Sequence, residues 1–572
     1  MTMRQDSGTE DWPLRPWIMA AICAVAGLLF HLLSDHPFAE PLAAWRQAGA
    51  TFVVIATVAF VLTVEQKRWL WSLYFALGWG VVIAMVGWFT AEYNHKPTIF
   101  EWPFLSGIFA VLLAAPLFQT MRDEGARRLP YRRLHGHAWT DAVIGAASLV
   151  FVGIAWLLAW LIASLFDLIG IEQIKNLVEE DWFGAMLSGF SFGAAVGLLR
   201  ERDALVGMLQ RLVMVVLSVL APVLAVALIA FLASVPFTGL DELWESVIPA
   251  TPLMLVAAAG AILLANAVIG DGSGNGGEED KPANRAFRLA VPALVLTVLP
   301  LAIIAAISLA QRIGQHGWTP ERIWGVVAVG VAIVYGIAGW WSVAKGRLNF
   351  DDVLRPLQTR MALGLCGLAL FLALPIVDFG AISARSQLAR LENGSVRADE
   401  FDWAAMAFDF GPSGRARLEQ VAKGGAADQR KFAVDALKEI NRSTVALGTE
   451  ARRDGREIAK RLRLASPDIV MTDELREQIG TTYGCLGKND QCVLMRIGPE
   501  RYLLVSTSGK KKRVTSSIID LADVRRAKGK GMVGLERVDV ENVDLDKARI
   551  EVREVRQRQL VVDGKDVGDP FE

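Results

Sequence analysis

The sequence predicts a mostly α-helical protein: a polytopic helical membrane bundle of about eleven spans, followed by an α+β water-soluble C-terminal region. Two observations support this fold class. The chain of 572 residues is 53% hydrophobic and 21% charged, with a mean hydropathy of +0.36. Its charges are unevenly divided, because about 14% of residues 1–382 are charged, against about 35% of residues 383–572. This composition excludes a soluble single-domain enzyme, a disordered chain and a disulfide scaffold.

Each predicted span is an apolar run of roughly 20 residues, the length of helix that crosses a hydrocarbon core about 30 Å thick. The runs are continuously apolar rather than alternating, which excludes a closed β-barrel. No small-residue cleavage site follows the first run, so we interpret it as an uncleaved helix. The runs occupy residues 17–33, 48–64, 69–89, 102–120, 141–169, 182–199, 205–235, 247–269, 287–310, 322–343 and 360–381.

The charges of the short loops predict the orientation. Loop 121–140 carries five arginines, which indicates that it is cytoplasmic, whereas loop 170–181 carries four acidic residues and one lysine. Basic and acidic loops alternate along the chain in this way, which predicts a cytoplasmic N-terminus. After an odd number of spans, the C-terminal region lies on the opposite side. We expect the loop arginines to meet anionic lipid headgroups at the cytoplasmic face.

The chain divides into three predicted parts: a transmembrane domain (1–382), a helical extracytoplasmic segment (383–465) and a small β-rich domain (466–572). Good helix formers and dense charge predict the helical stalk, broken at residues 411–414 with Ser413 as an N-cap. Two apolar runs flank residues 498–500, which indicates a β-hairpin, and Asp563-Gly564 predicts another.

Four cysteines indicate one covalent constraint. Cys485 and Cys492 form a C-x6-C pair in the tail, and in an oxidising compartment this pair predicts a disulfide. The alternative, a metal pair, lacks zinc spacing and a nearby histidine. Cys23 and Cys366 lie in apolar runs and are interpreted as packing residues. We expect no metal, no cofactor and no catalytic residue.

Two further patterns each allow a structural and a functional interpretation. Gly189, Gly193 and Gly197 are spaced four apart, so they form one helix face; tight packing within the bundle is favoured over a dimer face or a conduction path. His135 and His137 lie among arginines, and a solvated loop is favoured over a metal site.

Two stretches carry a likeness to a known family. Residues 317–324 include Trp318, Thr319, Pro320, Glu321 and Arg322, and residues 382–391 include Gln387, Arg390 and Leu391. With the many-span layout, they resemble a bacterial integral membrane family known only as a domain of unknown function (number 4153), over the chain up to about residue 420. The resemblance implies no reaction, substrate or site residue. The first stretch also suits a helix start, with Thr319 as N-cap and Pro320 at N1.

The expected location is the bacterial inner membrane, with a periplasmic C-terminal domain. The expected function is envelope-related and not catalytic: transport of a small or lipidic molecule, or sensing and scaffolding through the outer domain, with an envelope protein as partner. Nucleic acid is excluded by compartment. The alternative is a membrane-embedded glycosyl- or lipid-transferase acting at the outer face, for which Asp35, His36 and Glu40 of the first outer loop are the candidate residues.

Overall fold

The structure is a computed structural model, and two compact units make up the chain. They are Met1–Gln387 and Leu388–Glu572, and each is described by itself. The described residues are 12–35, 43–93, 102–125, 128–239, 249–271, 285–439, 441–481, 485, 490–508, 513–526, 535–537, 545, 558–562 and 565–571.

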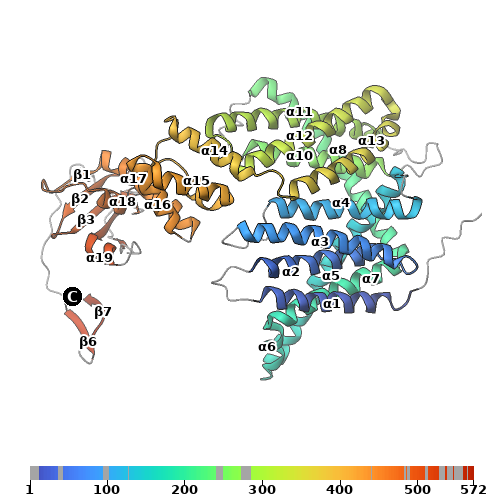
Figure 1. Cartoon of the computed structure of the whole chain (residues 1–572), viewed down its shortest axis with the longest axis horizontal. Helices are drawn as coiled ribbons and strands as arrows, with labels where there is room; N and C mark the ends of the chain where they lie inside the picture. The colour runs from blue at the N-terminus through green and yellow to red at the C-terminus, as the bar shows by residue number, and fades with distance from the viewer. Residues whose placement is uncertain are drawn as a thin grey trace, which may run out of the picture. The chain divides into compact units, whose positions relative to one another are not determined.

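The first unit confirms the predicted helical membrane bundle. Eleven of its described helices are long and apolar enough to cross a membrane. Figure 1 shows most of them side by side. They are α1 (Arg15–Ser34), α2 (Ala44–Thr63), α3 (Trp69–Tyr93), α4 (Trp102–Glu124), α5 (Tyr131–Asp167), α7 (Asp181–Glu201), α8 (Asp203–Thr238), α10 (Ala250–Ile269), α11 (Arg285–His316), α12 (Pro320–Gly346) and α13 (Phe350–Ala373).

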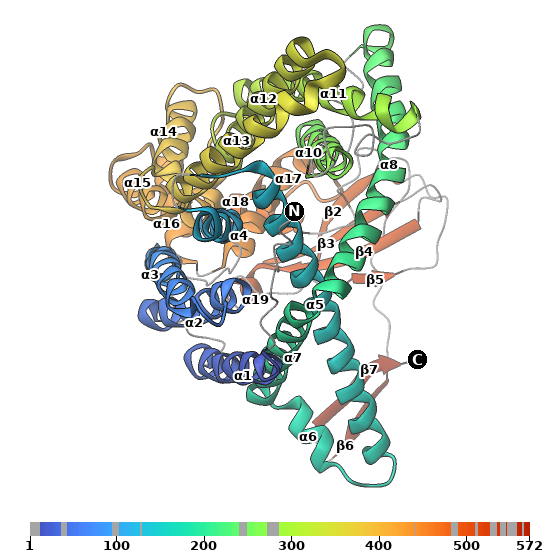
Figure 2. The ribbon, with the colours of Figure 1, turned by 90° about the vertical axis from the view of Figure 1, so that its right-hand side faces the viewer.

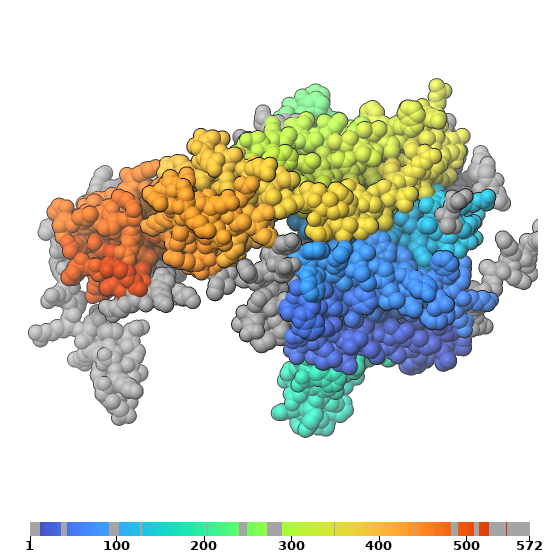
Figure 3. Space-filling model, in the orientation of Figure 1, coloured from blue at the N-terminus to red at the C-terminus, as the bar shows by residue number. Residues whose placement is uncertain are grey.

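The two longest of the described spans are inclined to the others. Helices α5 and α8 contain 37 and 36 residues. At about 1.5 Å per residue they exceed a hydrocarbon core of about 30 Å, so they must tilt to keep their apolar surface in lipid. In Figure 2, α5 and α8 are seen along their length, while α4 and α10 are seen nearly end-on. The end of α5 and the short α6 (Gln173–Glu179) project from the bundle (Figure 3).

The bundle packs as two groups of helices. One group joins α1 to α7, α2 to α3 and α5 to α7; the other joins α10, α11 and α12 to α8 and α13. The largest buried apolar cluster lies in the second group, with Leu294 and Leu301 of α11 fully buried at its centre. The groups meet where α4 packs on α13, and the Ser106 hydroxyl donates to the Ala369 carbonyl at 2.8 Å.

The predicted bounds of the last span are wrong. We expected residues 360–381, but α13 begins at Phe350 and ends at Ala373, and Pro375 follows in a turn before α14 (Phe379–Glu392). The prediction excluded the first turns of α13 because they are charged. Arg355 pairs with Asp351 one turn earlier at 3.3 Å, so the helix accommodates these charges internally.

The second unit contains the predicted helices in its first part and the predicted strands in its second part, with two short helices among the strands. Its helices are α15 (Gly411–Gly424), α16 (Ala427–Lys438), α17 (Arg442–Arg461), α18 (Asp473–Gly480) and α19 (Leu521–Arg526). The predicted N-cap is wrong: Ser413 lies inside α15, whose N-cap is Phe410. A π-helical turn, Ala405–Asp409, precedes this helix.

A five-stranded sheet forms the core of the second unit. Its order is β1 (Arg463–Leu464), β2 (Cys492–Arg496), β3 (Arg501–Ser508), β4 (Arg513–Asp520) and β5 (Leu535–Arg537), with β1 parallel to β2 and the other pairs antiparallel. The predicted hairpin at 498–500 is confirmed as the β2–β3 connection. The second is confirmed as β6 (Arg558–Val562) paired with β7 (Lys565–Phe571).

Candidate functional site

A buried ion pair links two spans of the first unit. Arg200, near the end of α7, contacts Asp141 of α5 at 2.7 Å, and the two side chains are only 12% and 11% exposed. Gln119 of α4 donates to the other carboxylate oxygen of Asp141 at 2.6 Å. Arg15 of α1 donates to the Val64 carbonyl just after α2, at 2.8 Å. These bonds join four spans and the end of a fifth.

The C-terminal end of α2 is closed by side chains from other helices. Arg122 of α4, 3% exposed, donates to the Thr63 carbonyl at 2.6 Å and pairs with Glu65. Ser72 of α3 donates to the same carbonyl at 2.8 Å. The last carbonyls of a helix have no partners within the helix and carry its negative dipole end, so cationic donors suit them.

These contacts revise two expectations about this region. His135 and His137 do not lie in a solvated loop, because both belong to α5; His135 is buried and His137 contacts Asp123 at 3.1 Å. Arg122 is committed inside the protein, so its guanidinium is not available to lipid headgroups. Arg132 and Arg133, with side chains 65% and 61% exposed, remain candidates for that role.

A second polar cluster lies between the two groups of helices. The Asn266 side chain at the end of α10 accepts a hydrogen bond from the Trp139 indole at 3.1 Å. Its amide nitrogen lies 3.2 Å from the Tyr131 hydroxyl and 3.3 Å from the Gln358 side-chain oxygen. Arg355 of α13 donates to the Ile269 carbonyl at 3.0 Å. One asparagine thus connects α5, α10 and α13.

The predicted glycine face lies against α1. A Cβ atom at Gly189 would collide with the Cys23 carbonyl, one at Gly193 with the Met19 carbonyl, and one at Gly197 would lie 2.5 Å from the Pro16 Cα atom. On the opposing helix, a Cβ at Gly27 would collide with the Ala185 carbonyl. The two backbones are therefore in direct contact along antiparallel helices, which is possible only without side chains.

The two stretches that carry the family resemblance contact each other. The Gln387 amide of α14 donates to the carbonyls of His316 and Trp318 at 2.9 Å each, and the Trp318 N–H donates to the Ser386 hydroxyl at 3.2 Å. The Arg322 guanidinium donates to the Gly317 carbonyl at 2.5 Å. We call the contact between Gln387, Ser386 and the α11–α12 turn the clasp.

The other motif residues have structural positions. Thr319 occupies the N-cap of α12 without a side-chain cap hydrogen bond, Pro320 begins the helix and Glu321 lies in its first turn. Leu391, in the second unit, is buried. Arg390 lies one residue earlier, in the last turn of α14.

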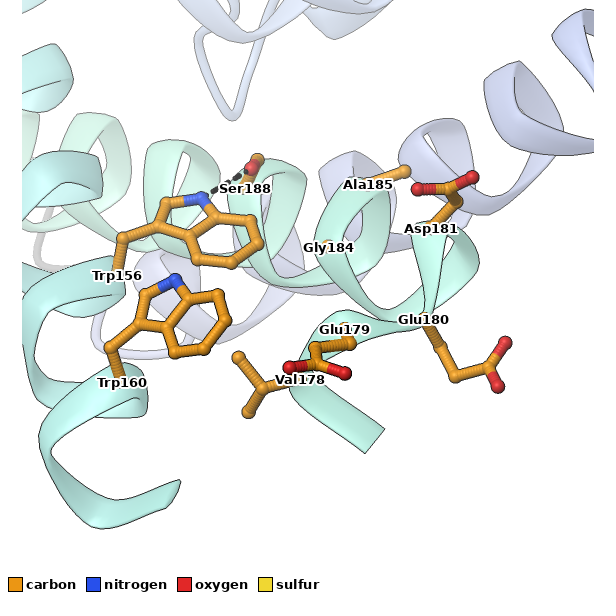
Figure 4. A pocket seen from close by; sticks show the side chains of 9 residues that line it. All are labelled: Trp156, Trp160, Val178, Glu179, Glu180, Asp181, Gly184, Ala185 and Ser188. Atoms are coloured by element: carbon orange, nitrogen blue, oxygen red, sulfur yellow. Dashed lines mark hydrogen bonds between the residues drawn. The ribbon is translucent and has the colours of Figure 1, made fainter. Parts of the chain in front are cut away.

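A pocket of about 460 Å³ lies between α5, α6 and α7 (Figure 4). Trp156 and Trp160 of α5 form one wall, and the Trp156 indole donates to the Ser188 hydroxyl at 2.9 Å. Figure 4 shows Glu179, the last residue of α6, on the side of the two indoles, while Glu180 and Asp181 point away from them. Sequence reasoning missed this pocket.

Of the three residues of the transferase alternative, only Asp35 lies within the described residues. Asp35 is the C-cap of α1, and its backbone carbonyl accepts a 2.5 Å hydrogen bond from Arg46. His36 and Glu40 lie outside the described residues. Across the described ranges, no group of three or more His, Cys, Asp or Glu side chains could hold a metal ion.

The predicted cysteine pair forms a disulfide. Cys485 and Cys492 are bonded and buried, with a Cα–Cα distance of 6.1 Å. They pack in an apolar cluster with Ile458 of α17, Leu475 of α18 and Leu494 of β2. The bond thus joins the start of the strand β2 to Cys485 inside this apolar cluster.

Comparison with known proteins identifies a family and nothing beyond it. The model of a family described as Domain of unknown function (DUF4153) matches residues 50–407, well over half of the chain. Both motif stretches and the clasp lie inside this range. No curated protein and no solved structure matches the chain.

Proposed function

Since the chain belongs to the family of the domain of unknown function DUF4153, we propose that it is a bacterial inner-membrane protein that senses or scaffolds through its C-terminal domain. In this proposal the N-terminus is cytoplasmic and the disulfide-bearing domain is periplasmic. An envelope protein is the partner of that domain.

Charge at the helix ends supports the orientation. Arg15, Arg68, Arg122 and Arg200 lie at the same ends of α1 to α4 and α7, where they bond to one another's helices. The connection between α5 and α7 carries Glu172 and three consecutive acidic residues, 179–181. Basic residues concentrate on the cytoplasmic side of membrane proteins, and an odd number of spans, such as the eleven candidates among the described helices, would leave the two chain ends on opposite sides.

The clasp is the observation that carries the proposal. Gln387 follows the last span and bonds to the α11–α12 turn, so the chain leaves the bundle at a fixed place. A chain that leaves the bundle at a fixed place suits a bundle that presents an attached domain or relays a signal to it. The buried charges described above are bonded inside the protein, as in Arg122 with the Thr63 carbonyl and Arg200 with Asp141, which favours this role over transport.

Reporter fusions test the orientation. With alkaline phosphatase fused after residues 134, 275 and 420, we expect activity only at 420, because the enzyme needs the oxidising periplasm. Activity at 275 would invert the topology and end the periplasmic proposal.

Cleavage of the assembled protein tests the role of the C-terminal domain. A protease site inserted at Gly425, between α15 and α16, lets the whole chain fold before the domain is released in spheroplasts. In a deletion strain, the uncut variant should complement the loss and suppress the envelope-stress response. We expect cleavage to bring back the envelope-stress response that the deletion strain shows. A site in the same place that the protease cannot cut is the control. Full complementation after complete cleavage would show that the bundle acts alone and would favour transport.

A further inference from the structure

The pocket between α5, α6 and α7 has a chemical character that the proposed function does not use. Two indoles form one wall. Of the three acidic residues that line the pocket, Glu179 lies on the side of the indoles, while Glu180 and Asp181 point away from them (Figure 4). We propose that this pocket binds an organic ammonium group, with Trp156 and Trp160 against the cation and Glu179 as its counter-charge.

The Trp156 indole is fixed before any ligand arrives. Its N–H donates to Ser188 at 2.9 Å, and its ring lies on the α7 backbone, because a Cβ at Gly184 would be only 3.0 Å from the ring. A tryptophan that merely anchors a helix at the interface turns its N–H to interfacial water. Here the N–H is bonded inside the protein, so the ring is held in place with one face toward the pocket.

The charges around the pocket leave Glu179 for a ligand. Lys175 lies one turn before Glu179 on α6, but its ammonium contacts Asp167 at 3.1 Å and interacts more weakly with the Glu179 charge. Glu179 also ends α6, where the helix presents its negative pole. A carboxylate at that pole is unfavourable alone and becomes favourable beside a cation. Aromatic faces with one carboxylate are the chemistry that recognises alkylammonium groups.

The surroundings indicate that the ligand also has an apolar part. Leu157 and Leu161 lie next to the tryptophans on α5 and are 72% and 56% exposed, on a helix long and apolar enough to span the membrane. A lipid headgroup with an amine and a free organic amine both contain the required ammonium. The proposal requires only the ammonium group, which either source supplies.

Binding is measured on the full-length protein with two probes. Choline is titrated while thermal unfolding of the detergent-solubilised protein is followed, because a ligand that binds the folded state raises its unfolding temperature. For the lipid arm, the protein is placed in phosphatidylglycerol nanodiscs with a minority of phosphatidylethanolamine, and co-released lipids are counted by native mass spectrometry. A choline response identifies a free amine as sufficient, and enrichment of phosphatidylethanolamine identifies the headgroup.

Matched variants separate this site from general charge effects. We expect E179Q to weaken binding about tenfold or more through the lost counter-charge, and W160L about three- to thirtyfold through the lost aromatic face. E180Q removes the same charge from a neighbouring lining residue whose side chain points away from the indoles, and should change affinity less than about twofold. Equal effects of E179Q and E180Q, or no saturable response to either probe in the unmodified protein, would overturn the proposal. Neither outcome bears on the cleavage experiment, so the two proposals fail separately.

Discussion

Gln387 donates a 2.9 Å hydrogen bond to the backbone carbonyl of Trp318, 69 residues earlier in the chain. The same amide group bonds to the His316 carbonyl. One side chain thus satisfies two carbonyls at the end of α11 and in the turn after it, where no helical N–H is available. The contact therefore joins two stretches that are far apart in sequence and that both lie inside the range matched by the family model.

Breaking the clasp should destabilise the first unit modestly. Gln387→Glu keeps the size of the side chain but removes its donor and places a carboxylate against two carbonyl oxygens. We expect a loss of about 1–2 kcal/mol, measured as a lower unfolding temperature of the purified protein. Arg385→Gln, an exposed position on the same helix, is the control and should leave the temperature unchanged. An unaltered unfolding temperature in Gln387→Glu would mean that the clasp contributes nothing to stability.

Alanine at the glycine face should be far more costly than alanine elsewhere in the bundle. Gly193→Ala places a Cβ against the Met19 carbonyl, so the two helices must separate. We expect a loss of about 1–3 kcal/mol and a lower folded yield in detergent. Gly153→Ala on α5 meets no atom within 4 Å and should be neutral or slightly stabilising, because alanine favours helix over glycine. Similar yields for the two variants would exclude direct backbone contact between α1 and α7.

Patterns that act locally could be predicted from the sequence. Each span is one continuous apolar run, so the number of spans followed from hydrophobicity, and each hairpin follows a short turn between apolar strands. The disulfide was predictable because Cys485 and Cys492 are close in sequence and lie in the polar tail. In all three cases the interacting residues are near one another in the chain.

Features that depend on distant residues could not be predicted. An arginine at the end of an apolar run has the same sequence pattern whether it reaches lipid or, like Arg122, closes another helix. Trp156 and Trp160 have the spacing of lipid-facing residues, and their pocket exists only because Ser188 and Glu179 come from other helices. The histidines were assigned to a loop because α5 begins with a polar turn that hydropathy excludes.

The buried pair of Arg200 and Asp141 provides a test of the network at the helix ends. Asp141→Asn leaves the Arg200 guanidinium buried without its counter-charge, and we expect a loss of about 3 kcal/mol. Arg133→Ala removes an ion pair with Glu124 of similar length, 2.9 Å, but more exposed, and should cost less than about 1 kcal/mol. Thermal unfolding of both variants provides the comparison. If Arg133→Ala lowered the unfolding temperature as much as Asp141→Asn, burial would not be the source of the stabilisation.

The disulfide should stabilise the second unit locally. Replacing Cys485 and Cys492 together by alanine removes a bond that closes a short loop, and the expected loss is about 2–3 kcal/mol. Hydrogen exchange in the full-length protein should then quicken in β2, β3 and α18, which pack around the bond, while the spans remain protected. Cys366→Ala, in a span, is the control. Unchanged exchange in β2 would show that packing alone holds this core.

The state of these cysteines in cells also decides the compartment of the C-terminal domain. If the domain is periplasmic, Cys485 and Cys492 resist alkylation in denatured protein until a reductant is added, because that compartment maintains disulfides. Cys23 and Cys366 are free thiols in the spans and should react without reductant, which provides an internal reference in the same sample. A cytoplasmic domain would instead be kept reduced. Alkylation of all four cysteines without reductant, in protein from aerobically grown cells, would therefore contradict the orientation on which the sensing or scaffolding role depends.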